Sequence, residues 1–172
     1  MVDSFFKEKN IYIVISGKEI KDKDLCKKIF KDTNEIYFID NPRLNRFPYN
    51  HLTPKNMINH ELKKGKKEMS FTDILELLEI NDYIERFERP WRYLGNNKWI
   101  CSAALGIAEG RKYFCLPWMH TGVMEYQEYR NNQIFQAMKK IGGNIIFPVE
   151  GLNKNKFINE EDICIKYIDE IL

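Results

Sequence analysis

The sequence lacks the long apolar runs and the leader segment that mark membrane and secreted proteins. Its longest apolar runs, at 11–15 and 145–147, are far shorter than the roughly 20 residues that a membrane-spanning helix needs. The N-terminal sequence MVDSFFKEKN has no hydrophobic run followed by a small-residue cleavage site, so it does not resemble a secretion signal. We therefore expect a cytoplasmic protein.

Cysteine and histidine, the usual soft metal ligands, are few and widely spaced. No C-x-x-C pair occurs, and no two of the three histidines are separated by one helical turn, so the common zinc and disulfide patterns are absent from the sequence. We expect neither a metal nor another cofactor. The four cysteines have apolar neighbours and are predicted to be buried thiols in a reducing compartment: Cys26, Cys101, Cys115 and Cys164.

A strong net charge is also missing. The 27 Lys and Arg residues nearly balance the 25 Asp and Glu residues, which leaves a formal charge of +2. A protein that binds nucleic acid through its overall field usually carries a larger excess of positive charge, so we do not expect nucleic acid as a partner. With 172 residues, of which 44% are hydrophobic, the chain is long enough for one compact domain with a core, spanning 1–172.

Apolar segments typical of strands alternate along the chain with segments of helical periodicity. This alternation predicts an α/β fold with a mostly parallel sheet and flanking helices. Three prolines make the segment from residue 41 to 54 irregular. Ser70 or Thr72 is expected to cap a helix. The predicted strands are at 10–16, 35–40, 112–119, 144–149 and 161–168, and the predicted helices are at 21–30, 70–87, 99–110 and 124–143.

A family resemblance rests on the order of several motifs. YLGNNKWICSAALGIAEG is followed by RKYFCLPWM, by HTGVM and, after a helix, by GGNIIFPVEG. In this order and spacing the segments resemble the signature loop and its helix, the Walker B strand, the loop beyond it and the switch-histidine strand of ABC transporter ATPases. Upstream, IYIVISGKEI looks like the family's GEILIDGKEI hairpin, and IYFIDNP looks like the strand before its Q-loop. The resemblance implies a truncated ABC-ATPase-like domain with a helical subdomain at about 53–105.

The residues that this family uses for chemistry are replaced. No G-x-x-x-x-G-K-[ST] motif occurs, and only about ten residues precede the hairpin-like segment, so the strand, phosphate-binding loop and helix of the P-loop are expected to be missing. The sequence SGK at Ser16–Lys18 lacks the first glycine and the Mg²⁺-binding hydroxyl. The resemblance places the other family motif positions on Tyr93, Leu94, Gly95, Asn96 and Asn97 (signature), Pro117 and Trp118 (Walker B) and Glu150 (switch histidine).

These replacements remove the magnesium ligand, the catalytic carboxylate and the γ-phosphate contacts, so the chain is expected not to be an enzyme. An enzyme of another class would need a nucleophile with a base, or a metal cluster, and the sequence indicates neither. In ABC ATPases the region that corresponds to residues 41–54 of this chain forms part of the groove that binds a coupling helix of the membrane subunit. A loop folded over the chain's own core is the alternative. The candidate contact residues are Asn41, Arg43, Arg46, Phe47, Tyr49 and Leu52.

The resemblance thus predicts a non-catalytic subunit with a structural or regulatory role. Its expected partners are an ABC membrane subunit, a competent ATPase subunit or a second copy of the chain, and it would lie in the cytoplasm or at the inner face of the membrane. The alternative is a soluble binding module on the same scaffold that binds another protein or RNA. The basic sequence KKGKK at Lys63–Lys67, with three Trp and nine Tyr residues, is the support for this alternative.

Overall fold

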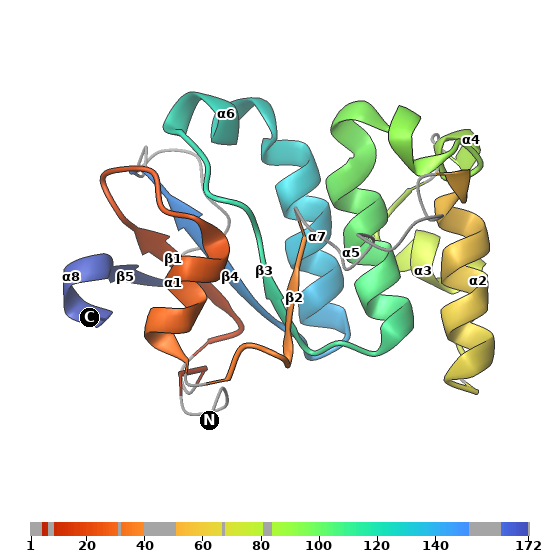
Figure 1. Cartoon of the computed structure of the whole chain (residues 1–172), viewed down its shortest axis with the longest axis horizontal. Helices are drawn as coiled ribbons and strands as arrows, with labels where there is room; N and C mark the ends of the chain where they lie inside the picture. The colour runs from red at the N-terminus through yellow and green to blue at the C-terminus, as the bar shows by residue number, and fades with distance from the viewer. Residues whose placement is uncertain are drawn as a thin grey trace. The chain divides into compact units, whose positions relative to one another are not determined.

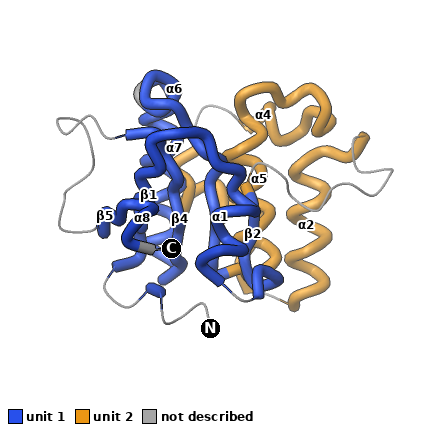
Figure 2. Tube along the Cα trace, turned by 60° about the vertical axis from the view of Figure 1, so that its left-hand side comes forward, with its two compact units in different colours: residues 1–38, 112–172 blue, residues 39–111 orange. Residues whose placement is uncertain are grey.

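The computed structural model divides into two compact units (Figure 2). Unit 1 combines residues 1–38 and 112–172, and unit 2 is the continuous segment 39–111. The helical subdomain expected at about 53–105 lies inside unit 2. The structure describes residues 5–6, 9–30, 32–39, 51–66, 68–80, 84–151 and 163–171.

Unit 1 is built on a five-stranded sheet in which every pair of neighbours is parallel. The strand order is β2-β3-β4-β1-β5, with β2 and β5 at opposite edges (Figure 1). The near-continuous apolar sequence of β1 and β4 suits strands that are buried on both faces. The α/β fold with a mostly parallel sheet is confirmed. The strands are β1 Ile11–Ile15, β2 Ile36–Phe38, β3 Tyr113–Cys115, β4 Asn144–Val149 and β5 Ile163–Tyr167.

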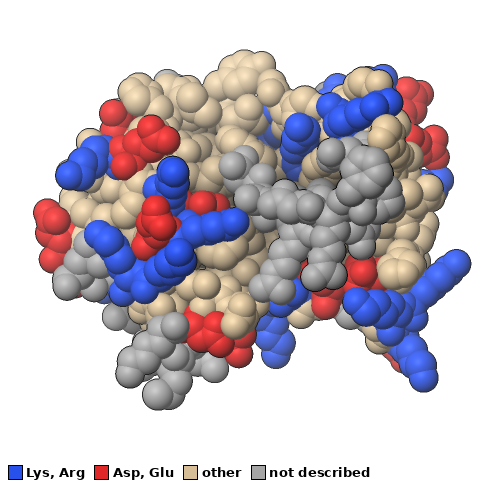
Figure 3. Space-filling view, in the orientation of Figure 1, with Lys and Arg blue, Asp and Glu red and all other residues tan. Residues whose placement is uncertain are grey.

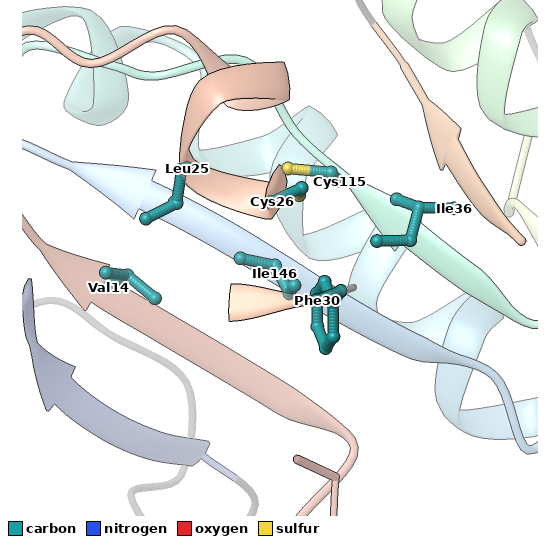
Figure 4. Packing of buried hydrophobic residues seen from close by; sticks show 7 residues of the cluster. All are labelled: Val14, Leu25, Cys26, Phe30, Ile36, Cys115 and Ile146. Atoms are coloured by element: carbon teal, nitrogen blue, oxygen red, sulfur yellow. The ribbon is translucent and has the colours of Figure 1, made fainter. Parts of the chain in front are cut away.

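Helices α1 and α7 cover opposite faces of this sheet. Val14 and Ile146 pack with Leu25 of α1 in one buried cluster (Figure 4). Phe147, the next residue of β4, turns to the other face because side chains alternate along a strand, and its ring lies 5.6 Å from that of Phe135 in α7. The helices of unit 1 are α1 Asp22–Ile29, α6 Thr121–Tyr126, α7 Glu128–Lys140 and α8 Ile168–Ile171.

The N-terminal segment does not form the hairpin that the resemblance implied. Strand β1 lies inside the sheet, where it pairs in parallel with both β4 and β5, and residues 16–21 connect it to α1. The helix forms because Leu25 and Ile29 recur at helical spacing and Asp22 lies in the first turn, at the positive end of the helix dipole. A strand, a loop and a helix therefore do precede β2, so the expectation that this unit is missing is wrong. The loop contains Gly17-Lys18, but it lacks the first glycine and the final Ser or Thr of the G-x-x-x-x-G-K-[ST] motif.

Unit 2 is helical, and helix α5 is its centre. Every residue of α5 from Ile100 to Ala108 is buried, and the helix packs against α2 and α3. Ser70 is the N-cap of α3, which is one of the two residues predicted for this role. It forms a capping box with Asp73: the Ser70 hydroxyl accepts from the Asp73 amide, and the Asp73 carboxylate accepts from the Ser70 amide. The helices are α2 Pro54–Lys64, α3 Phe71–Leu77, α4 Ile84–Phe87 and α5 Lys98–Glu109, with 3₁₀ turns η2 Trp91–Tyr93 and η3 Gly95–Asn97.

Candidate functional site

The sheet topology points to one edge of unit 1 as the place for a functional site. From β1 the chain proceeds through α1 to β2 at one edge of the sheet, whereas from β4 it passes to β5 at the other edge. Neighbouring strands β1 and β4 thus send their connections in opposite directions. Open parallel sheets bind ligands outside the carboxyl ends of such a strand pair. The residues that follow β1 and β4, namely Ser16 and Glu150, mark this carboxyl edge.

Backbone hydrogen bonds tie three segments together at the carboxyl edge. The amides of Ser16 and Gly17 donate to the carbonyls of Val149 and Glu150, over 3.0 and 3.1 Å. The Glu150 amide in turn donates to the Met119 carbonyl over 3.0 Å. The loop after β1 is therefore fastened to the end of β4, and its first two amides point at carbonyl groups of the protein and not at a ligand.

The hydroxyl group of Ser16 is engaged on both of its sides. Its oxygen accepts a hydrogen bond from the indole Nε1 of Trp118 over 2.9 Å, and it donates to the Lys18 carbonyl over 2.7 Å. The Val149 carbonyl lies within reach as a second acceptor, at 3.2 Å. A serine nucleophile needs a base that accepts its proton. Here the hydroxyl donates its hydrogen bond to backbone carbonyls, which cannot take up its proton. The arrangement therefore fixes the loop and does not activate the hydroxyl.

Glu150 collects three donors on one carboxylate oxygen. Its Oε2 accepts from the Thr121 hydroxyl at 3.1 Å and from the Thr121 amide at 3.4 Å. The third donor is Nε2 of His120, at 3.1 Å. The Gly122 amide donates to the other ring nitrogen, Nδ1, over 3.2 Å. Because Nδ1 is the acceptor, the proton of the neutral imidazole lies on Nε2, between the ring and the carboxylate.

This pairing leaves the histidine unsuited to base or metal chemistry. A general base needs an unprotonated ring nitrogen that faces the substrate, and a histidine metal ligand usually donates its second N–H to another group. In His120, Nδ1 faces the Gly122 amide and Nε2 holds the proton. Within the described parts of the chain, no three His, Cys, Asp or Glu residues are grouped so that they could hold a metal ion.

The positions that the resemblance singled out are divided between the two units. Pro117, Trp118 and Glu150 belong to unit 1 and surround the carboxyl edge, whereas the signature-like residues 93–97 belong to unit 2. In that segment Leu94 is buried and Tyr93 is 62% exposed. The segment is held by its own hydrogen bonds, since the Asn97 side chain accepts from Arg86 over 2.7 Å and donates to the Leu94 carbonyl. Gly95 and Asn96 lie with Asn97 in η3.

Most of the proposed partner-binding loop falls outside the described residues. This applies to Asn41, Arg43, Arg46, Phe47 and Tyr49. Leu52 is described: its side chain is 37% exposed, and its carbonyl accepts from the Trp91 amide over 3.0 Å.

The basic cluster begins at the end of α2, where Lys63 and Lys64 lie in the last turn and Lys64 pairs with Glu61 at 3.3 Å. Figure 3 shows Lys and Arg interspersed with Asp and Glu over the visible face, in keeping with the small net charge.

Ser16, His120 and Thr121 were missing from the sequence-based set of site residues. Ser16 is the last residue of one predicted strand, and His120 and Thr121 follow another. The carboxyl ends of parallel strands meet at one edge of the sheet, and this is the signal that could have identified them. Their partners are far away in the sequence: Ser16 and Trp118 are 102 positions apart.

The cysteines are buried, as expected, and they are free thiols. Cys26 of α1 and Cys115 of β3 lie together in the cluster of Figure 4. Burial, followed by the contact with Cys26, raises the pKa of Cys115 well above its ordinary value. Burial likewise raises the pKa of Cys101 in α5. A thiol is nucleophilic only as the thiolate, so these cysteines serve as core residues.

Comparison of the chain with protein-family models gives no match, and comparison with curated proteins gives none either. Across the described residues, no helix has both the length and the hydrophobicity that crossing a membrane requires.

Proposed function

We propose that this chain is a non-catalytic subunit on an α/β scaffold of the ABC ATPase type, which acts through contacts with a partner. One observation carries the proposal. The loop between β1 and α1 lies where a phosphate-binding loop would lie, since such loops join a strand to a helix, but its first two amides bond to the protein itself. Ser16 and Gly17 donate to the end of β4, so these N–H groups are not available to cradle a phosphate.

Electrostatics at the carboxyl edge support the same proposal. The carboxylate of Glu150 is only 34% exposed and lies beside this loop. Bringing a triphosphate to that position would place two negative groups together in a partly buried setting, where their repulsion is stronger than in water. A bound magnesium ion could offset this repulsion, but Pro117 and Trp118, which follow β3, have no carboxylate that could bind one.

Unit 2 supplies the support for a role in partner binding. Among its described residues it exposes three large apolar side chains: Leu52, Ile84 and Tyr93 are 37%, 44% and 62% accessible. Leu52 was expected as a partner anchor, and Tyr93 belongs to the signature-like segment. The proposed partner is an ABC membrane subunit or a catalytically competent ATPase, which would supply the chemistry that this chain lacks.

Nucleotide binding is tested by thermal unfolding of the purified chain with Mg-ATP, Mg-ADP and Mg²⁺ alone. We expect the three melting curves to coincide. A ligand present at 100 times its Kd would stabilise the fold by about 2.7 kcal/mol, which is easily detected. An intact ABC ATPase in the same assay is the positive control. Stabilisation of this chain by Mg-ATP, and not by Mg²⁺ alone, would overturn the proposal.

Partner binding is tested by co-purification with a tagged chain from its native cells. We expect an ABC membrane subunit or ATPase to co-purify with the wild type and to be reduced with Leu52→Asp. Asn56→Asp, which adds the same charge at another exposed position nearby, serves as the matched control. Recovery of neither partner, together with salt-sensitive binding of labelled RNA, would favour the alternative of a repurposed binding module.

A further inference from the structure

The segment 89–98 of unit 2 contains three basic residues and no acidic residue. Arg89, Arg92 and Lys98 are all exposed. In the part of the chain that the structure describes, none of the three takes part in an ion pair. Their positive charges are therefore available to an anionic ligand.

Two buried side chains determine how this segment presents its other residues. Trp91 and Leu94 are only 6% and 3% exposed, and the Trp91 amide donates to the Leu52 carbonyl over 3.0 Å. Three residues complete one turn of a 3₁₀ helix, so Trp91 and Leu94 share the inner side of η2. Arg92 and Tyr93 lie between them and face outward, and Tyr93 is 62% exposed. The outward position of a cation and an aromatic ring thus follows from the turn itself.

Arg92 and Tyr93 together form a flat surface. The guanidinium carbon of Arg92 lies over the Tyr93 ring, 4.6 Å from the ring centroid. A guanidinium group in this position is attracted by the ring and is itself planar. Gly95 follows shortly after in the chain, and a Cβ at its position would meet nothing within 4 Å. Because the ring is mostly exposed and the turn after it is open, a planar group of a ligand can reach this surface.

The charges around the 89–98 segment leave a positive excess. Two acidic residues precede it, Glu85 and Glu88, and Glu88 is paired with Lys55 at 2.7 Å. Together with Lys55, residues 84–98 carry five cations against two carboxylates, so their local charge of +3 exceeds the +2 of the whole chain. Figure 3 shows Lys and Arg side chains at the upper right, over the region where Figure 1 places α4 and the start of α5. The small net charge of the chain therefore conceals a basic surface on unit 2.

We propose that the 89–98 segment binds single-stranded nucleic acid. Arg89, Arg92 and Lys98 would contact phosphate groups of the strand, and an unpaired base would stack on the surface formed by Arg92 and Tyr93. Proteins that bind single strands combine cations that follow the phosphates with aromatic rings on which the bases stack. This inference goes beyond the proposed function and does not depend on it.

The pairing of cations with an exposed ring favours a single strand over other anions. A duplex keeps its bases inside the stack, so it could use the cations but not the ring of Tyr93. An acidic peptide could likewise use the cations, but its carboxylates have no flat face to place on the ring. A single strand presents several phosphates together with unpaired bases, which is the combination that this surface can bind.

The test is fluorescence anisotropy of the full-length chain with labelled twelve-nucleotide single strands, U12 and dT12, and with a labelled duplex of twelve base pairs. We expect micromolar binding of both single strands and at least about threefold weaker binding of the duplex, although the duplex has the higher charge density. The logarithm of the binding constant for U12 should fall with the logarithm of the salt concentration with a slope of about −2, since each of three neutralised phosphates contributes about −0.7.

Charge reversal at two lysines of unit 2 locates the binding surface. Lys98→Glu should weaken binding of U12 at least about tenfold, and it should not disturb the fold because an acidic residue in the first turn of α5 favours the helix. Lys63→Glu makes the same change at an exposed lysine in the last turn of α2, and it is the matched control, with an expected change of less than about twofold. Circular dichroism should show the wild-type fold for both variants.

Substitution of the ring tests the stacking. Tyr93→Ala should weaken binding of U12 by about tenfold, whereas Tyr93→Phe, which keeps the ring, should bind as the wild type does. The proposal would be overturned by a lack of binding to either single strand at about 100 μM protein, the weak end of non-specific affinities. Equal binding of the duplex, equal effects of Lys63→Glu and Lys98→Glu, displacement of U12 by a polyglutamate peptide of equal charge, or full binding by Tyr93→Ala would overturn it as well. These measurements use the purified chain alone, and recovery of an ABC subunit from cells is a separate result, so this proposal and the proposed function fail separately.

Discussion

Individual side chains at the carboxyl edge of the sheet hold the polypeptide in place, and they do so as a connected set. Ser16 links the indole of Trp118 to the loop after β1, and Glu150 links His120 and Thr121 to the end of β4. Hydrogen bonds in such a network support one another, since each partner restricts the positions of the next. This network supports the structural role that we propose for the edge.

The contact between Ser16 and Trp118 can be measured as a coupling. Trp118→Phe keeps an aromatic ring but removes the indole N–H, and Ser16→Ala removes the acceptor. We expect each variant to lower the free energy of unfolding by about 1 kcal/mol, in line with a partly buried hydrogen bond. The double variant should lose less than the sum of the two, by about 0.5 kcal/mol or more. Urea denaturation of the four proteins gives these values, and strict additivity would show that the two side chains do not interact.

Helices and strands were predicted from the sequence to different extents. The parallel sheet, helix α7 and the terminal strand β5 follow from periodicity, because long apolar runs and amphipathic stretches are local signals. The pairing of β1 is not local: whether Ile11–Ile15 turns back as a hairpin or joins β4 in parallel depends on residues more than a hundred positions away. Family resemblance favoured the hairpin, and the polar, helix-spaced residues after Gly17 decided against it.

The candidate site was only half predicted for the same reason. Trp118 and Glu150 were identified through the motif register, whereas Ser16, His120 and Thr121 acquire their roles from contacts that form only when the carboxyl ends of three strands meet. No spacing rule in the sequence connects Ser16 with Trp118. Knowledge of the strand order alone would predict that these residues meet at one edge of the sheet.

The start of helix α3 offers a prediction about pH. A hydrogen bond from the Ser70 amide to the Asp73 carboxylate, at 2.6 Å, is the main cause that lowers the pKa of Asp73, and the Ser70 side chain adds to it. Because the folded-state pKa is lower than the unfolded value, this contribution to stability is complete above the ordinary carboxyl pKa and disappears as the pH falls through the folded value.

We therefore expect Asp73→Asn to lower the urea midpoint at neutral pH, and the difference from wild type to shrink below about pH 4. Glu76→Gln, an exposed change later in the same helix, is the matched control and should give a smaller difference at neutral pH. An Asp73→Asn effect that stays constant from pH 7 to pH 3 would contradict this account of the cap.

Unit 1 is made of two separate segments of the chain, whereas unit 2 is one continuous segment. This difference affects how the protein unfolds. Unit 2 leaves the sheet after β2 and returns to it at β3, and these two strands are neighbours. It can open as a long loop while the sheet stays paired, because closing a loop costs entropy that grows only slowly with its length. Unit 1 has no such option, because its two segments must meet to form the ladders of β1 with β4 and β5.

The buried cysteines provide probes of this difference, since Cys101 lies in unit 2 and Cys26 and Cys115 lie in unit 1. Burial makes all three thiols inaccessible in the native state, and the pKa values of Cys101 and Cys115 are also raised, so a thiol reagent modifies each one only after its surroundings open. With pulses of maleimide at sub-denaturing urea and mass spectrometry of the digested protein, we expect Cys101 to be modified before Cys26 and Cys115. Fully denatured protein, in which all thiols should react alike, calibrates intrinsic reactivity. Earlier modification of Cys115 would mean that the sheet opens first and that unit 2 is the more stable part of the chain.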